Sequence, residues 1–451
     1  MPSSPEWDNR PALHKKPRFK WVSWVGASHL VSVAAMIILY LILGLLFERI
    51  VATRYSFGSF RINPRDDYWI EILAVIVAGF VLPVDPKRMS EIFAWLSTVF
   101  LLIPAAVLSA HQGSDRAAMF MMFGGVWLVM VICRTFTTLN VLQISKSRAN
   151  AHVNISVLIA ALILTLSLLI FHVGGTFNLS MSSVYDFRQD FNESLTFPLS
   201  YLLPFAGGPL SGFIAAYLMH KKKYKLLAIP VVVGILLFGF STHKAMLFYP
   251  LFAVVIYTAI TSRAGHIYLM GLFIFLSAAT FLTAGTGLED FLGSSFANRL
   301  VFIPAQIHYF FFREFADIGP QFWAESRLSF GLARSDLPLP SVNYIGLMMT
   351  GYPEIGANTG WIANGYMNGW LFGIVLYSII MAATLHVIDS LGERYGYGFI
   401  GAAFAIPIFN MINSIDLLAG YLTGGLLLLF VIAFLFIQPK DLSTDPVRDA
   451  R

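Results

Sequence analysis

Charged residues and cysteine are both scarce in this sequence, and each scarcity excludes a class of protein. Only 12% of the 451 residues are charged, whereas 57% are hydrophobic and the mean hydropathy is +0.71. A soluble chain of this length carries about 25% charged residues. The single cysteine, Cys133, can form no internal disulfide. These values exclude a soluble or disulfide-stapled protein and predict that the chain lies in a lipid bilayer.

Motifs of soluble enzymes are also missing. The sequence has no phosphate-binding Gly-rich loop ending in Lys-Thr, no G-x-S-x-G element, no paired-His zinc signature and no cysteine pair. It therefore predicts no metal, no cofactor and no nucleotide chemistry. The formal net charge of +5 requires no nucleic-acid partner, because basic residues next to a membrane face anionic lipid.

Long apolar runs dominate what is present. A helix needs roughly 20 apolar residues to cross the ~30 Å hydrocarbon core. Twelve runs approach this length: 27–48, 69–84, 90–110, 117–133, 151–172, 198–219, 226–241, 245–261, 266–284, 366–388, 397–413 and 417–437. The second and seventh are short enough to be re-entrant or tilted instead. The predicted fold is all-α, a polytopic transmembrane helical bundle of about 12 spans.

Basic residues indicate the orientation of this bundle. Five of them precede the first run: Arg10, Lys15, Lys16, Arg18 and Lys20. Lys and Arg resist translocation, so this end is expected inside, and the same topology keeps most of the 30 Lys and Arg residues on the inner side. We predict cytoplasmic tails at 1–26 and 438–451, flanking one membrane domain at 27–437.

The longest break between apolar runs is 285–365, which the topology places on the outer face between the ninth and tenth spans. Aromatic residues such as those at 309–312 alternate there with charged ones such as Arg313 and Glu314. This mixture is typical of a partly helical segment that lies at the membrane interface. The sequence predicts a large outer loop.

Three cations are expected on the outer face, although Lys and Arg are usually more frequent on the inner side of a membrane protein. Lys244 opens an apolar run, where an ammonium either meets an anionic head group or snorkels at a helix end. Arg299 is placed to bind phosphate bidentately, with ordinary lipid phosphate as the alternative ligand. Arg188 binds phosphate or pairs with its neighbours Asp186 and Asp190. If the three cations converge, they form a clamp for a diphosphate.

Candidates for proton transfer and for sugar binding lie on the same face. Glu354 and His308 are the candidate bases, although a loop carboxylate is often merely solvated and a histidine among aromatic residues is often packed. Aromatic rings stack on sugars or belong to the interfacial belt, and amides bind hydroxyls or cap helices. The candidates of this kind are Tyr185, Asn358, Trp361 and Asn364.

Four short motifs resemble those of the bacterial O-antigen polymerases, which polymerise oligosaccharide repeat units. The motifs are the Tyr-to-Arg element at 184–188, residues 241–245, which resemble the Ser/Gly-x-Lys step of the family into a span, the segment with Arg299, Pro304 and Tyr309, and the Asn- and Gly-rich return to the membrane at 357–373. The layout of about a dozen spans with a large late outer loop is also similar. In the family, the segment that returns to the membrane often carries an acidic residue, and this chain has Asn364 at that position.

The resemblance implies an inverting, metal-independent glycosyl transfer on the periplasmic face of the bacterial inner membrane. The implied substrate is an undecaprenyl-diphosphate-linked oligosaccharide, and the product is an O-antigen of lipopolysaccharide, a capsule or an exopolysaccharide. Arg188, Lys244 and Arg299 would hold the diphosphate, and Glu354 or His308 would take the proton. A chain-length regulator and a flippase are implied partners. An O-antigen ligase and a transporter or flippase of lipid-linked glycan remain alternative functions.

Overall fold

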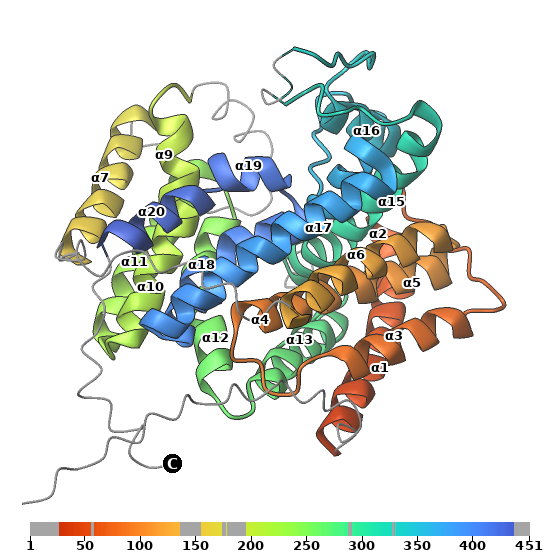
Figure 1. Ribbon diagram of the computed structural model, residues 1–451, viewed down its shortest axis with the longest axis horizontal. Helices are drawn as coiled ribbons and strands as arrows, with labels where there is room; N and C mark the ends of the chain where they lie inside the picture. The colour runs from red at the N-terminus through yellow and green to blue at the C-terminus, as the bar shows by residue number, and fades with distance from the viewer. Residues whose placement is uncertain are drawn as a thin grey trace, which may run out of the picture.

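The computed structural model describes residues 27–55, 58–135, 155–173, 177, 195–286, 291–326, 329 and 331–436. All regular structure in these ranges is helical (Figure 1). The elements are α1 (Ala27–Leu46), η1 (Phe47–Val51), α2 (Ala52–Arg54), α3 (Trp69–Val81), α4 (Met89–Ser97), η3 (Thr98–Leu102), α5 (Ile103–Gln112), α6 (Arg116–Thr135), α7 (Ile155–Val173), α9 (Leu199–Phe205), η5 (Ala206–Leu210), α10 (Ser211–His220), η6 (Tyr224–Leu227), α11 (Ala228–Ser241), α12 (Ala245–Thr261), α13 (Gly265–Leu282), η7 (Leu292–Phe302), α15 (Ile303–Ile318), α16 (Ser341–Thr350), α17 (Trp361–Tyr395), α18 (Tyr397–Asn413), α19 (Leu417–Leu422) and α20 (Leu426–Phe436).

Nine helical stretches within the described ranges are long and apolar enough to cross a membrane. They are His29–Arg54, Met89–Gln112, Arg116–Thr135, Ile155–His172, Leu199–His220, Tyr224–Ser241, Gly265–Leu282, Trp361–Tyr395 and Leu417–Phe434. Three shorter apolar helices, α3, α12 and α18, correspond to the remaining apolar runs. The chain is therefore a multi-pass, all-helical membrane protein. The short second run is indeed a short helix, whereas the seventh is part of a full-length one.

The helix formed by α4, η3 and α5 lies at the centre of the bundle. Its side chains from Leu101 to Ile103 have no exposed surface, and it contacts helices from both halves of the chain, among them α1, α3, α17 and α18. A helix that is apolar on every side and buried on every side needs protein, not lipid, around it. Helices from both halves of the chain therefore pack around this one helix.

The segment η7–α15 differs from the expected outer loop. These residues form one continuous helix that packs against α5, α13 and α17. Phe302, Phe311 and Phe315 are completely buried in it. The prediction of an interfacial segment was wrong for residues 292–318, because their aromatic side chains fill the core of the bundle. Arg299 and the charged end of α15, from Arg313 onwards, reach the surface.

The helix α17, which runs diagonally across the middle of Figure 1, is broken near its start. Gly369 and Trp370 leave the helical conformation, and Trp370 has a φ of 51°. The first turns fold back on the rest, so that a Cβ on Gly373 would lie 1.9 Å from the carbonyl oxygen of Gly365. The non-helical residues Thr359 and Gly360, which directly precede this helix, are buried, so protein surrounds the backbone at the point where the helix begins.

Gly373→Ala is expected to destabilise the protein by about 1–3 kcal/mol, because the added methyl group meets a backbone carbonyl that cannot rotate away. Gly271→Ala, in the middle of α13 with open space around it, is the matched control and should be neutral or slightly stabilising. Thermal unfolding of both variants in detergent measures the difference. Equal melting temperatures would show that the break is not tightly packed.

Candidate functional site

Lys244 and Arg299 lie close together at one end of the bundle. Lys244 immediately precedes α12, and Arg299 is an exposed residue of η7. Burial lowers the pKa of the Lys244 ammonium below its ordinary value, and the neighbouring charge of Arg299 lowers it further. Two like charges within electrostatic range repel each other, so an anion that binds near both relieves the repulsion. The structure thus brings together two of the three cations that the sequence singles out.

Packing at the start of α12 explains this proximity. The ring of Phe248 lies against that of Phe291, with 6.1 Å between the centroids, and so joins the first turn of α12 to the residue before η7. The turn that leads into α12 has Thr242 in the left-handed conformation, with a φ of 59°. A non-glycine residue in this conformation is strained, and such strain is common at functional sites.

Three polar side chains beside the two cations have an unsatisfied atom. The hydroxyls of Thr242 and Ser295 and the side-chain oxygen of Asn298 are buried without a hydrogen-bond partner within the described part of the chain. Buried polar atoms nearly always have a partner. In addition, η7 is π-helical over its whole length, and π-helical turns occur frequently at functional sites. The Asn298 oxygen only accepts hydrogen bonds, whereas the two hydroxyls can donate, so the hydroxyls and the two cations indicate a site for an anion.

The remaining candidates from the sequence are distributed differently. Arg188 and Tyr185 lie outside the described residues. Glu354 and Asn358 are exposed in the non-helical stretch that precedes α17, where a substrate in solution can reach them. Asn364 is buried within the first turns of α17, and its side-chain oxygen accepts a hydrogen bond of 2.8 Å from the amide of Asn368. Its amide therefore stabilises the broken helix.

Trp361 and His308 occupy the core. Neither side chain has exposed surface. The Trp361 ring packs 6.4 Å from that of Phe93, so it offers no face to a sugar and does not belong to the interfacial belt. Nδ1 of His308 lies 2.7 Å from the carbonyl oxygen of Pro304. The assignments of a sugar platform to Trp361 and of an accessible base to His308 do not fit these positions, because both rings are enclosed by neighbouring helices.

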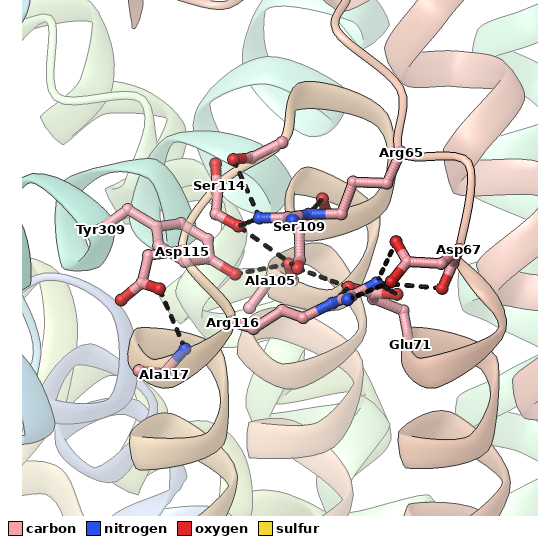
Figure 2. Close-up of polar contacts among 11 residues, drawn as sticks. Arg65, Asp67, Glu71, Ala105, Ser109, Ser114, Asp115, Arg116, Ala117 and Tyr309 are labelled. Atoms are coloured by element: carbon pink, nitrogen blue, oxygen red, sulfur yellow. Dashed lines mark hydrogen bonds and ion pairs between the residues drawn. The ribbon is translucent and has the colours of Figure 1, made fainter.

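A polar network that the sequence did not reveal lies around Arg116 (Figure 2). The Arg116 guanidinium donates to the carboxylate of Glu71 at 2.7 Å and to that of Asp67 at 2.7 Å. The Ser109 hydroxyl donates to the same Glu71 oxygen at 2.7 Å. Glu71 is completely buried, and the hydrogen bond from Arg116 lowers the pKa of the exposed Asp67 carboxyl.

The same network extends from the loop before α3 to the turn between α5 and α6. Arg65 donates to the carbonyl oxygens of Ser109 at 3.0 Å and Ser114 at 2.9 Å, while Tyr309 on α15 donates to that of Ala105 at 2.8 Å. Figure 2 shows the side chains of the network converging from the loop before α3, from α3, α5 and α6, and from α15. Since Arg116 pairs with both Asp67 and Glu71, and Arg65 and Tyr309 bond to backbone carbonyls, the network positions α3, α6 and α15.

Comparisons with known proteins gave no match: no family model, no curated protein and no solved structure is similar to this chain. The class of the protein therefore follows from its own helices, which define a multi-pass membrane protein.

Proposed function

We propose that this protein is a polymerase that joins undecaprenyl-diphosphate-linked oligosaccharide repeat units into a surface polysaccharide. The observation that carries the proposal is the pair formed by Lys244 and Arg299, which come from separate segments and are bordered by unsatisfied polar atoms. Two adjacent cations at the end of a membrane bundle suit a diphosphate whose lipid tail stays in the bilayer.

The reaction needs no metal and no cofactor in this proposal. The acceptor hydroxyl attacks the anomeric carbon of the donor, the bond to the diphosphate oxygen breaks, and the diphosphate leaves with the electron pair. Lys244 and Arg299 stabilise the charge that grows on the leaving group, and the bundle holds both lipid-linked substrates in line. Glu354, which is exposed, takes the hydroxyl proton. Arg188 supplies a third cation.

We infer twelve crossings with both termini in the cytoplasm of a bacterium, in its inner membrane. Contacts between loops support this topology, because loops assigned to the same side meet. On the inner side, Arg134 in the last turn of α6 donates to the carbonyl oxygen of Val81, the last residue of α3, at 2.6 Å. On the outer side, the backbone N–H of Asn63 donates to the carbonyl oxygen of His111 at 2.9 Å. A flippase and a chain-length regulator would act with the protein.

Transport of a lipid-linked glycan is the alternative from another class, and it calls for ionisable residues along a path through the spans. The two carboxylates near span starts that would suggest such a path are instead partnered. Glu71 pairs with Arg116 at 2.7 Å, and Oδ2 of Asp416 accepts from the backbone N–H of Leu418 at 3.1 Å as the N-cap of α19. This pairing favours chemistry at the outer surface. An O-antigen ligase would use the same donor and differ only in its acceptor.

The test is the length distribution of surface polysaccharide on gels from a deletion strain that carries Lys244→Ala, Arg299→Ala or Arg188→Ala. A polymerase predicts loss of the long ladder while a single repeat unit stays attached. Lys223→Ala is the matched control, since it removes an exposed lysine from the inner side and should leave the ladder intact. Loss of all attached glycan would indicate a ligase or flippase, and an unchanged ladder would contradict the site.

A further inference from the structure

A second group of unsatisfied polar atoms lies around the residues that enter α17. The side chains are those of His308 on α15, Trp361 on α17 and Asn413 on α18, with exposed fractions of 0%, 0% and 4%. Nε2 of His308, Nε1 of Trp361 and both amide atoms of Asn413 have no hydrogen-bond partner within the ranges that the structure describes. Four such atoms in one core region require an explanation.

These residues meet at one short segment, 359–361. Trp361 is the last residue of the segment, and α15 and α18 lie next to it. Thr359 Oγ1 lies 3.4 Å from Nδ1 of His308. Gly360 approaches α18 so closely that a Cβ there would lie 2.1 Å from the carbonyl oxygen of Ile412, the residue before Asn413. The segment therefore passes between α15 and α18, with His308 on one side and, on the other, the last turn of α18, which ends at Asn413.

Hydrogen-bond chemistry assigns a role to each unsatisfied atom. A carbonyl oxygen only accepts, so Nδ1 of His308, 2.7 Å from that of Pro304, carries a proton. Burial lowers the pKa of His308 to about 4, which leaves the ring neutral at pH 7 and Nε2 an acceptor. Trp361 Nε1 is a donor only, and Asn413 has one donor group and one acceptor group.

This set of atoms selects a ligand that both donates and accepts. An anion would satisfy Trp361 and leave His308 without a donor, and a metal cation would do the reverse. A hydroxyl group satisfies both. We propose that segment 359–361 encloses a binding site for one hydroxyl ligand, either an internal water molecule or a hydroxyl of a glycan, bound by His308, Trp361 and Asn413. The site does not depend on the proposed polymerase activity.

Asn413→Leu gives the first test, because leucine has a similar size and no polar atom. If Asn413 binds a hydroxyl ligand, the variant loses those hydrogen bonds and its melting temperature in detergent falls by about 2 °C or more. If the amide is instead buried without a ligand, the apolar side chain removes an unsatisfied group and the melting temperature rises. Met411→Leu, on the same turn, is the matched control and should change little. A rise for Asn413→Leu overturns the proposal.

The indole N–H of Trp361 reports the source of the hydroxyl. The protein is labelled with ¹⁵N-tryptophan and studied by NMR in nanodiscs. The signal of the Trp361 indole is the one that is missing from the spectrum of Trp361→Phe. A cross-peak with water supports an internal water molecule. Loss of that cross-peak and a shifted indole signal, on addition of undecaprenyl-diphosphate-linked oligosaccharide, support a glycan hydroxyl. If the indole shows neither a water cross-peak nor a shift, the proposal is overturned whatever the melting temperatures.

Discussion

Lys244→Ala and Arg299→Ala are each expected to lower kcat for polymerisation about 10²–10³-fold, because each removes a cation from the charge that develops on the leaving diphosphate. The assay uses purified protein in nanodiscs with lipid-linked repeat units and follows product length with time. Melting temperatures should stay close to that of the wild type, since Arg299 is exposed and Lys244 lies at a helix start. A loss of stability equal to the loss of activity would indicate a structural role.

The double variant decides whether the two cations act on one ligand. If both bind the same diphosphate, the combined loss is much smaller than the product of the single losses, because the substrate is already misplaced once one cation is gone. Losses that multiply fully would place the cations at separate sites and contradict the proposed clamp.

Lys244→Arg is the charge-conserving control. The folded pKa of Lys244 is lowered, so the wild type loses this charge as the pH rises through that value, earlier than an exposed lysine would. Arginine keeps its charge. The alkaline decline in kcat/KM should therefore shift to higher pH in Lys244→Arg, and an unshifted decline would show that another group controls it.

Arg116→Met is expected to cost about 3 kcal/mol of stability, since it leaves the buried Glu71 carboxylate without its cation. The value is at the low end for a buried pair because Arg116 keeps 20% of its side chain exposed. Unfolding in detergent followed by circular dichroism measures the loss.

The double variant Glu71→Gln with Arg116→Met removes both charges and should recover most of this stability. Asp67, the other carboxylate that Arg116 contacts, is 53% exposed, and an ion pair in water adds little stability. Asp67→Asn alone should therefore change the melting temperature little. A stable Arg116→Met variant would mean that Glu71 is already neutral in the folded protein.

The sequence predicted the membrane class and most helix positions because both depend on local properties. A crossing needs a sufficient length of apolar residues, and Met89–Gln112 or Gly265–Leu282 can be recognised without knowing any neighbour. The sequence also singled out Lys244 and Arg299 for a similar reason, as cations on the side where cations are rare. The proximity of the two could not be read from it.

By itself, then, the sequence determined that the chain is a multi-pass helical membrane protein, and it predicted that Lys244 and Arg299 lie on the outer face. Only the tertiary structure decided that 292–318 lies in the core, that α17 breaks at Gly369, and that Arg116 pairs with Glu71. The physical reason is that hydrophobicity and length belong to one segment, whereas burial and hydrogen-bond partnership depend on which distant segments pack against it. The same aromatic helix lies at an interface or fills a core according to its neighbours.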